Sequence, residues 1–163
     1  MKAKCVIVSL SVLIFANGKT LAESGKQGNA DSKQIVAYCL ARGQEHGQKE
    51  NWKGIENYLA ATKLILVTLG SKAYTYSRDG KLVKSGKAIH PSAGIIGDYA
   101  ESGWEYLDKN NKIFSDMLGH YLLRKVGGKW KLEAEGGTDG YDQDRALQKA
   151  HVPENIQKRL KYR

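Results

Sequence analysis

The chain has 163 residues, of which 41% are hydrophobic and 26% charged, and only two are proline. This length fits one domain of about 150 residues, and the composition is that of a globular chain, which excludes a mainly disordered protein. Two cysteines exclude both a disulfide-rich scaffold and a four-cysteine zinc site. The 26 basic and 17 acidic residues give a formal net charge of +9.

An uncharged apolar run, residues 5–16, follows two lysines at the N-terminus. It is shorter than the roughly 20 residues that a membrane-spanning helix needs and falls within the about 7–15 of a signal-peptide core. We therefore expect a signal peptide over residues 1–22, cleaved after Ala22, with cleavage after Gly18 as the alternative. The product would be periplasmic or secreted, without a stable membrane anchor. It would remain basic, with 23 basic against 17 acidic residues, because only three lysines are removed.

Residues 23–30 are polar and glycine-containing, which predicts a flexible leader, and residues 31–163 form a single α+β domain. Asp31 or Ser32 is expected to cap a first helix that ends at Gly43. Apolar residues recur in it at helical spacing: Ile35, Val36, Cys39 and Leu40. On this face Cys39 is expected to be a buried thiol. The same spacing over 52–59 predicts a second helix.

Residues 62–69 are rich in β-branched side chains and stop at Gly70, which favours a buried strand over a continued helix. Asp79-Gly80 and Gly127-Gly128 then predict two-residue hairpin turns. A turn-rich cluster, residues 108–111, is expected to join two further strands. Together these signals predict a curved antiparallel meander of about five strands.

The second hairpin predicts one apolar face from its period of two. Its members are Trp130, Leu132 and Ala134 from one strand and Tyr121 and Leu123 from the other. After it, helical spacing returns at Leu147 and at Ile156 and Leu160, behind Pro153. The predicted fold class is thus α+β: N-terminal helices, the antiparallel sheet and short C-terminal helices that cover it.

The sequence contains no G-x-S-x-G nucleophile motif, and its histidines, residues 46, 90, 120 and 151, show no metal-ligand spacing. We expect no metal and no cofactor. The acidic segment Asp98–Asp116 is interpreted as a solvated rim rather than a glycosidase carboxylate pair. Residues 139–144 are interpreted as a turn followed by a helix start, because the EF-hand spacing of acids and glycine is missing.

Positive charge concentrates around the first hairpin, where residues 58–97 carry six cations and one acid. The predicted partner-binding residues are Lys72, Tyr74, Tyr76, Arg78, Lys81, Lys84 and Lys87. Two tyrosines among cations can stack on and neutralise an anionic partner. The favoured alternative places Tyr74, Tyr76 and Val83 in the core and leaves the cations at a basic rim.

These features predict an exported, non-catalytic domain that binds another macromolecule, as an inhibitor, immunity-type or accessory protein does. The expected partner is an acidic protein or another polyanion of the envelope or the exterior. Nucleic acid is disfavoured because export removes the chain from it. The alternative is a small-ligand or enzymatic pocket inside the curved sheet, lined by Trp104, Tyr106, Tyr121 and Trp130. No motif identifies a family.

Overall fold

The computed structural model describes residues 21–49, 64–89, 91–108, 110–136 and 143–160. The predicted signal peptide falls mostly outside these ranges, since residues 1–20 are not among them. The predicted second helix at 52–59, His90 and the acidic turn at 139–142 also lie outside the described residues.

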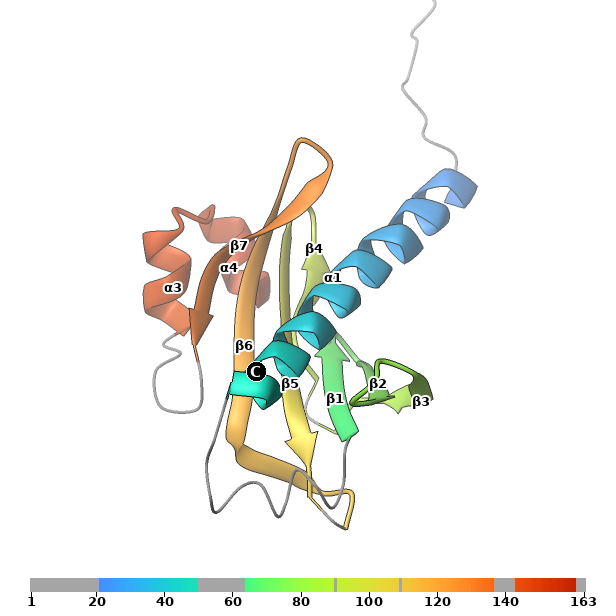
Figure 1. The fold of residues 1–163 in the computed structure, drawn as a ribbon. Helices are drawn as coiled ribbons and strands as arrows, with labels where there is room; N and C mark the ends of the chain where they lie inside the picture. Colours follow the sequence, from blue (N-terminus) through green and yellow to red (C-terminus); the bar gives the residue numbers. More distant parts are fainter. Residues whose placement is uncertain (1–20, 50–63, 90, 109, 137–142, 161–163) are drawn as a thin grey trace, which may run out of the picture.

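An antiparallel sheet forms the centre of the molecule, with one long helix across one face and two short helices packed against the other (Figure 1). The strands are β1 (Leu64–Leu69), β2 (Lys72–Ser77), β3 (Leu82–Lys87), β4 (Gly94–Ile96), β5 (Tyr99–Leu107), β6 (Ile113–Val126) and β7 (Lys129–Gly136). The helices are α1 (Leu21–Lys49), α3 (Gln143–Lys149) and α4 (Glu154–Leu160). The predicted α+β class is confirmed, and so is the strand predicted at 62–69 over its described residues, 64–69, but the sheet has seven strands rather than about five.

The sheet is not one meander. Its strand order is β3-β2-β1-β5-β6-β7, and β4 pairs with β5 beside the end of β1. β1 pairs with β5 from Ser102 to Tyr106 and β4 pairs with it from Tyr99 to Glu101, so β1 and β4 lie end to end along one edge of β5. The β2–β3 hairpin is the segment of chain that connects β1 to β4. Hydrogen bonds close its base, because the Ser92 amide donates to Gly70 O at 3.0 Å and the Gly70 amide to Ser92 Oγ at 2.7 Å.

Helix α1 begins before the predicted cap at Asp31 and includes residues 23–30, which the sequence predicts as a leader. It also continues past Gly43, where the sequence predicts its end. A Cβ on Gly43 would lie 3.1 Å from Ile65 Cγ2 and 3.2 Å from the Trp104 ring. Gly43 therefore lets the helix approach the sheet closely and does not terminate it.

The face of α1 that meets the sheet is the predicted one. Ile35, Val36 and Cys39 are buried with Ile65 and Val67 of β1. Cys39 is a free, fully buried thiol, as expected, and its Sγ donates to Ser102 Oγ at 3.3 Å. Burial raises the pKa of this thiol to about 12, so it stays protonated at neutral pH.

Asp31 does not cap α1 but joins it to the β6–β7 hairpin. It is 7% exposed. Its two carboxylate oxygens accept from Lys125 Nζ at 2.8 and 2.9 Å, and Oδ1 also accepts from Trp130 Nε1 at 3.2 Å.

The opposite face of the sheet carries a second core under the C-terminal helices. Leu122 belongs to this core and Leu123 to the core under α1, because neighbouring residues of a strand point to opposite faces. Leu147 of α3 and Leu160 of α4 are fully buried here, which confirms the predicted C-terminal helices. Asp144 lies in the first turn of α3, as expected.

The second hairpin has the predicted two-residue turn. Gly127 and Gly128 have φ angles of 58° and 77°, and Lys125 lies opposite Trp130. A bulge then shifts the register, because Leu123 pairs with Leu132 but Leu122 pairs with Ala134. Trp130 and Leu132 share the face of Tyr121 and Leu123, as predicted, and this face packs on the α1 side, whereas Ala134 packs with the opposite core.

The first hairpin has a longer turn than predicted. The Ser77 amide donates to Lys81 O at 2.9 Å, so the loop includes Arg78 as well as Asp79-Gly80. Gly80 ends this loop with a φ of 86°, as a three-residue hairpin loop requires. A bulge at Val83 compensates for the extra loop residue, and the strands return to the expected register at Thr75 opposite Lys84.

Among the described helices, none combines the length and the apolar character needed to cross a membrane.

Candidate functional site

The seven residues predicted to bind a partner do not share one surface. Tyr74 and Tyr76 are partly buried and pack against the core under α1, opposite Val67 and Ile65 of β1. Burial is the main cause that raises the pKa of the Tyr76 hydroxyl, and electrostatic repulsion from an ionised Tyr74 raises it further. The favoured alternative, in which these side chains belong to the core, is therefore confirmed for both tyrosines. It is wrong for Val83, which is 56% exposed because the bulge turns it out of the strand pattern.

Two of the five predicted cations are held by local contacts. Arg78 donates from Nη2 to Gly47 O of α1 at 3.0 Å, and its own carbonyl accepts from Gln44 Nε2 at 2.9 Å, so it fastens the turn to the helix. Lys81 forms an exposed ion pair with Asp79 at 3.0 Å. The Ser77 hydroxyl, then Lys81, lowers the pKa of Asp79 to about 2.

The other three cations are exposed on the hairpin strands. Lys72 of β2 lies opposite Lys87 of β3, and Lys84 lies opposite Thr75. Every residue of β3 is exposed, and β3 lies at one end of the sheet order. This edge therefore carries an accessible positive charge.

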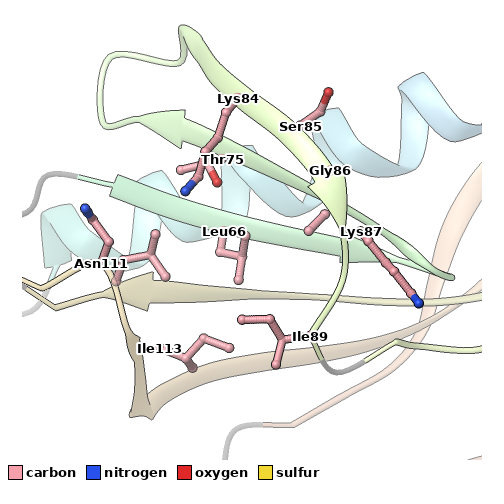
Figure 2. A pocket seen from close by; sticks show the side chains of 11 residues that line it. Leu66, Thr75, Lys84, Ser85, Gly86, Lys87, Ile89, Asn111 and Ile113 are labelled. Atoms are coloured by element: carbon pink, nitrogen blue, oxygen red, sulfur yellow. The ribbon is translucent and has the colours of Figure 1, made fainter.

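A groove of about 250 Å³ runs beneath β3 on the face of the sheet opposite α1. Leu66, Ile89 and Ile113 converge at its centre, while Lys84 extends over Thr75 at one side (Figure 2). Leu107 adds to its apolar lining. The groove thus combines an apolar floor with a cationic rim.

Exposed apolar side chains concentrate on β3 and at Ile89, which lines the groove. Among the described residues, the large hydrophobic side chains that are exposed are Leu82, Val83, Ile89 and Val126. Three of these four lie within residues 82–89, and Ile89 is 79% exposed. An apolar cluster of this kind, edged by polar groups, is typical of an interaction surface.

A second, shallow depression of about 540 Å³ lies on the α1 side of the hairpin. Gly28 and Ser32 of α1 line one side, and Lys72 and Tyr74 line another. It is open, and none of the exposed large apolar side chains of the described residues lines it.

The predicted acidic rim is only partly exposed. Glu101 is 1% exposed, and its Oε2 accepts from Gln143 Nε2 at 2.6 Å, so it is a buried residue and not part of a solvated rim. Burial raises the pKa of Glu105 to about 7. Asp108 shapes the β5–β6 turn, where its Oδ1 accepts from the amides of Asn110 and Lys112 at 2.7 and 2.9 Å.

Within the described part of the chain, no three histidine, cysteine, aspartate or glutamate residues gather closely enough to hold a metal ion. His46 packs against Trp104, with ring centroids 5.1 Å apart. Burial lowers the pKa of His120, which favours its neutral form.

The aromatic residues that could line an interior pocket are packed against α1. Trp104 and Tyr106 are 3% and 1% exposed, and Trp104 Nε1 donates to the Tyr121 hydroxyl at 2.8 Å. The Tyr106 hydroxyl donates to Gly43 O. Trp130 lies against the same core, and its Nε1 donates a hydrogen bond to Asp31. Neither of the two hollows described above is lined by these side chains.

The sequence prediction missed the groove floor. Leu66, Leu107 and Ile113 lie on three strands, and only the observed strand order brings them together with Ile89. One usable signal was present, because the large apolar residue Ile89 follows the cationic strand and directly precedes a Pro-containing loop.

No family model, curated protein or solved structure matches the chain.

Proposed function

We propose that this protein is a non-catalytic binding domain that recognises an acidic segment of another protein through β3 and the groove beneath it. The observation that carries the proposal is the clustering of three exposed apolar side chains with exposed lysines within residues 81–89. Apolar contacts supply affinity, and the lysines select anionic partners and accelerate encounter.

The size of the groove favours a protein segment over a small ligand. Pockets for drug-sized ligands have volumes of about 300–1,000 Å³, and this groove has about 250 Å³. Such a volume accommodates one or two apolar side chains of a partner. Acids of the same partner segment would then meet Lys84 at the groove rim and Lys87 on the other side of β3.

The biological setting that we propose is the periplasm or the exterior, because the N-terminal residues have the pattern of a cleaved signal peptide. An exported domain that occludes an acidic surface would act as an inhibitor, an immunity-type protein or an accessory subunit. The alternative, a ligand or enzymatic pocket in the sheet interior, has less support because Trp104, Tyr106 and Tyr121 are buried in the core there.

A charge-reversal experiment tests the proposal. The 163-residue chain is titrated with a labelled decapeptide of alternating glutamate and valine, and binding is followed by fluorescence anisotropy. We expect Lys84→Glu/Lys87→Glu to weaken binding about 10- to 100-fold. This corresponds to about 1.4–2.8 kcal/mol, on the order expected for reversing two rim charges.

The matched control reverses two exposed lysines on the other edge strand, Lys129→Glu/Lys131→Glu on β7. It makes the same change in net charge, and we expect less than a twofold effect on binding. Raising the salt concentration from 50 to 200 mM should weaken binding of the wild type. Equal affinity of both double variants, or equal binding of a lysine–valine decapeptide, would contradict the proposal.

A further inference from the structure

We propose that the acidic partner binds by adding a β-strand to the open edge of β3. This inference rests on the proposed function and specifies how the same site holds its partner. Within the described chain β3 pairs with β2 alone, and it ends the sheet order. A strand edge of this kind offers unpaired backbone donors and acceptors to another chain.

The register identifies the backbone groups that face outward. The Ala88 amide donates to Ser71 O at 2.9 Å. In an antiparallel pair, bonded positions recur at every second residue. Gly86 and Lys84 therefore direct their amides and carbonyls to β2, whereas Ser85 and Lys87 direct theirs to the open edge.

The bulge at Val83 limits how much of β3 can pair regularly. Residues 84–87 remain as a regular stretch, so the partner contributes a short extended segment. Exposed Leu82 and Val83 lie at one end of this stretch and exposed Ile89 near the other, where apolar side chains of the segment find contacts.

Charge selects the occupant. A second copy of this chain that paired through β3 would bring Lys84 and Lys87 of one strand against the same lysines of the other, which is unfavourable. Lysines and bulges on edge strands prevent pairing of like with like. An acidic segment meets no such penalty, because its carboxylates lie beside the lysines. The edge is thus closed to self-association and open to an acidic strand.

The test uses backbone chemistry, which charge alone does not affect. The 163-residue chain is titrated with the glutamate–valine decapeptide and with two copies of it, each N-methylated at one set of alternating residues. N-methylation removes amide donors and leaves every side-chain charge in place. For strand addition we expect at least one methylated peptide to bind at least tenfold more weakly than the parent.

The matched protein variants are Ser85→Pro and Ser85→Ala. Proline removes the amide that faces the open edge, and edge strands tolerate it there. We expect Ser85→Pro to weaken binding at least tenfold and Ser85→Ala to leave it within twofold. Should Ser85→Pro fail to fold by circular dichroism, amide exchange on the wild type decides, because peptide binding should slow exchange at Ser85 and Lys87.

The outcomes separate the two proposals. If all three peptides bind equally and the Ser85 and Lys87 amides stay unprotected, strand addition is wrong and recognition of an acidic partner stands. If the parent peptide does not bind at all, the proposed function fails first. If sedimentation velocity shows dimers that Ser85→Pro abolishes, a second copy occupies the edge and the inference is overturned.

Discussion

The buried ion pair between Asp31 and Lys125 gives the most direct test of how α1 is held on the sheet. Asp31 is 7% exposed, and both of its carboxylate oxygens accept from Lys125 Nζ. The substitution Asp31→Leu would leave the Lys125 ammonium without its partner. Breaking a buried pair in this way costs about 3–5 kcal/mol. The Lys125 side chain is 16% exposed and can turn partly toward water, so we expect about 2–3 kcal/mol.

Urea denaturation followed by circular dichroism at 222 nm measures this loss. The double variant Asp31→Leu/Lys125→Met removes both charges, so it should recover most of the stability that Asp31→Leu loses. The control is Glu154→Gln in the exposed Glu154–Lys158 pair, whose side chains are 80% and 72% exposed, with an expected change below about 0.5 kcal/mol. A double variant that loses the sum of both single losses would refute the reasoning, because the two charges would then be uncoupled.

Three further substitutions or reactions test the packing around the sheet. Burial raises the pKa of Glu105 from its ordinary 4.5 to about 7, so its favourable contribution to stability is complete below pH 4.5 and is lost as the pH rises through 7. Glu105→Gln should therefore stabilise the protein by about 1–2 kcal/mol at pH 8, a value reduced to allow for the partial exposure of Glu105. At pH 4.5 the substitution should change the stability very little. Equal effects in urea titrations at both pH values would contradict this. The Cys39 thiol, studied in a Cys5→Ser background, should react with a disulfide reagent at pH 8 only after urea unfolding, and fast native labelling would show that it is accessible. Gly119→Ala should cost about 1–3 kcal/mol, because the new Cβ would lie 2.7 Å from Trp104 Cε2, and an unchanged midpoint of unfolding would show that the ring can move.

Local turn chemistry made both hairpins predictable. Gly80 and Gly127-Gly128 take the positive φ angles that such turns require, and few other residues do so easily. The bulges could not be predicted. The bulge opposite Thr75 offsets a longer loop, and the bulge opposite Leu122 and Leu123 moves Ala134 to the other core. Both depend on packing across the sheet, which a period of two does not contain.

The helix prediction failed for a related reason. Asp31 has the residue type and spacing of a helix cap, and Gly43 has those of a stop. In the fold each has a tertiary role. Asp31 forms an ion pair with Lys125, and Gly43 has no side chain that would clash with Trp104 and Ile65. Local sequence does not distinguish these roles, because the partners lie far along the chain.

The candidate site was half predictable. Clustered lysines predicted a basic strip, and Lys72, Lys84 and Lys87 are indeed exposed together on the hairpin strands. The inward direction of Tyr74 and Tyr76 followed from the need to bury one face of the sheet. The groove did not follow, because β5 and β6 supply Leu107 and Ile113 only through the strand order.

The hydrogen-bonded base of the β2–β3 hairpin separates the exposed strand β3 from the place where β1 and β4 meet. The chain leaves the line of β1 at Gly70 and rejoins it near Ser92, where the two segments are clasped. Within the described chain β3 pairs with β2 alone, so substitutions at its exposed positions leave the pairing of β1 and β4 with β5 in place, whereas β2 is held by Tyr74 and Tyr76 in the core. The exposed side chains of this one edge strand can therefore vary while the hydrophobic core stays constant.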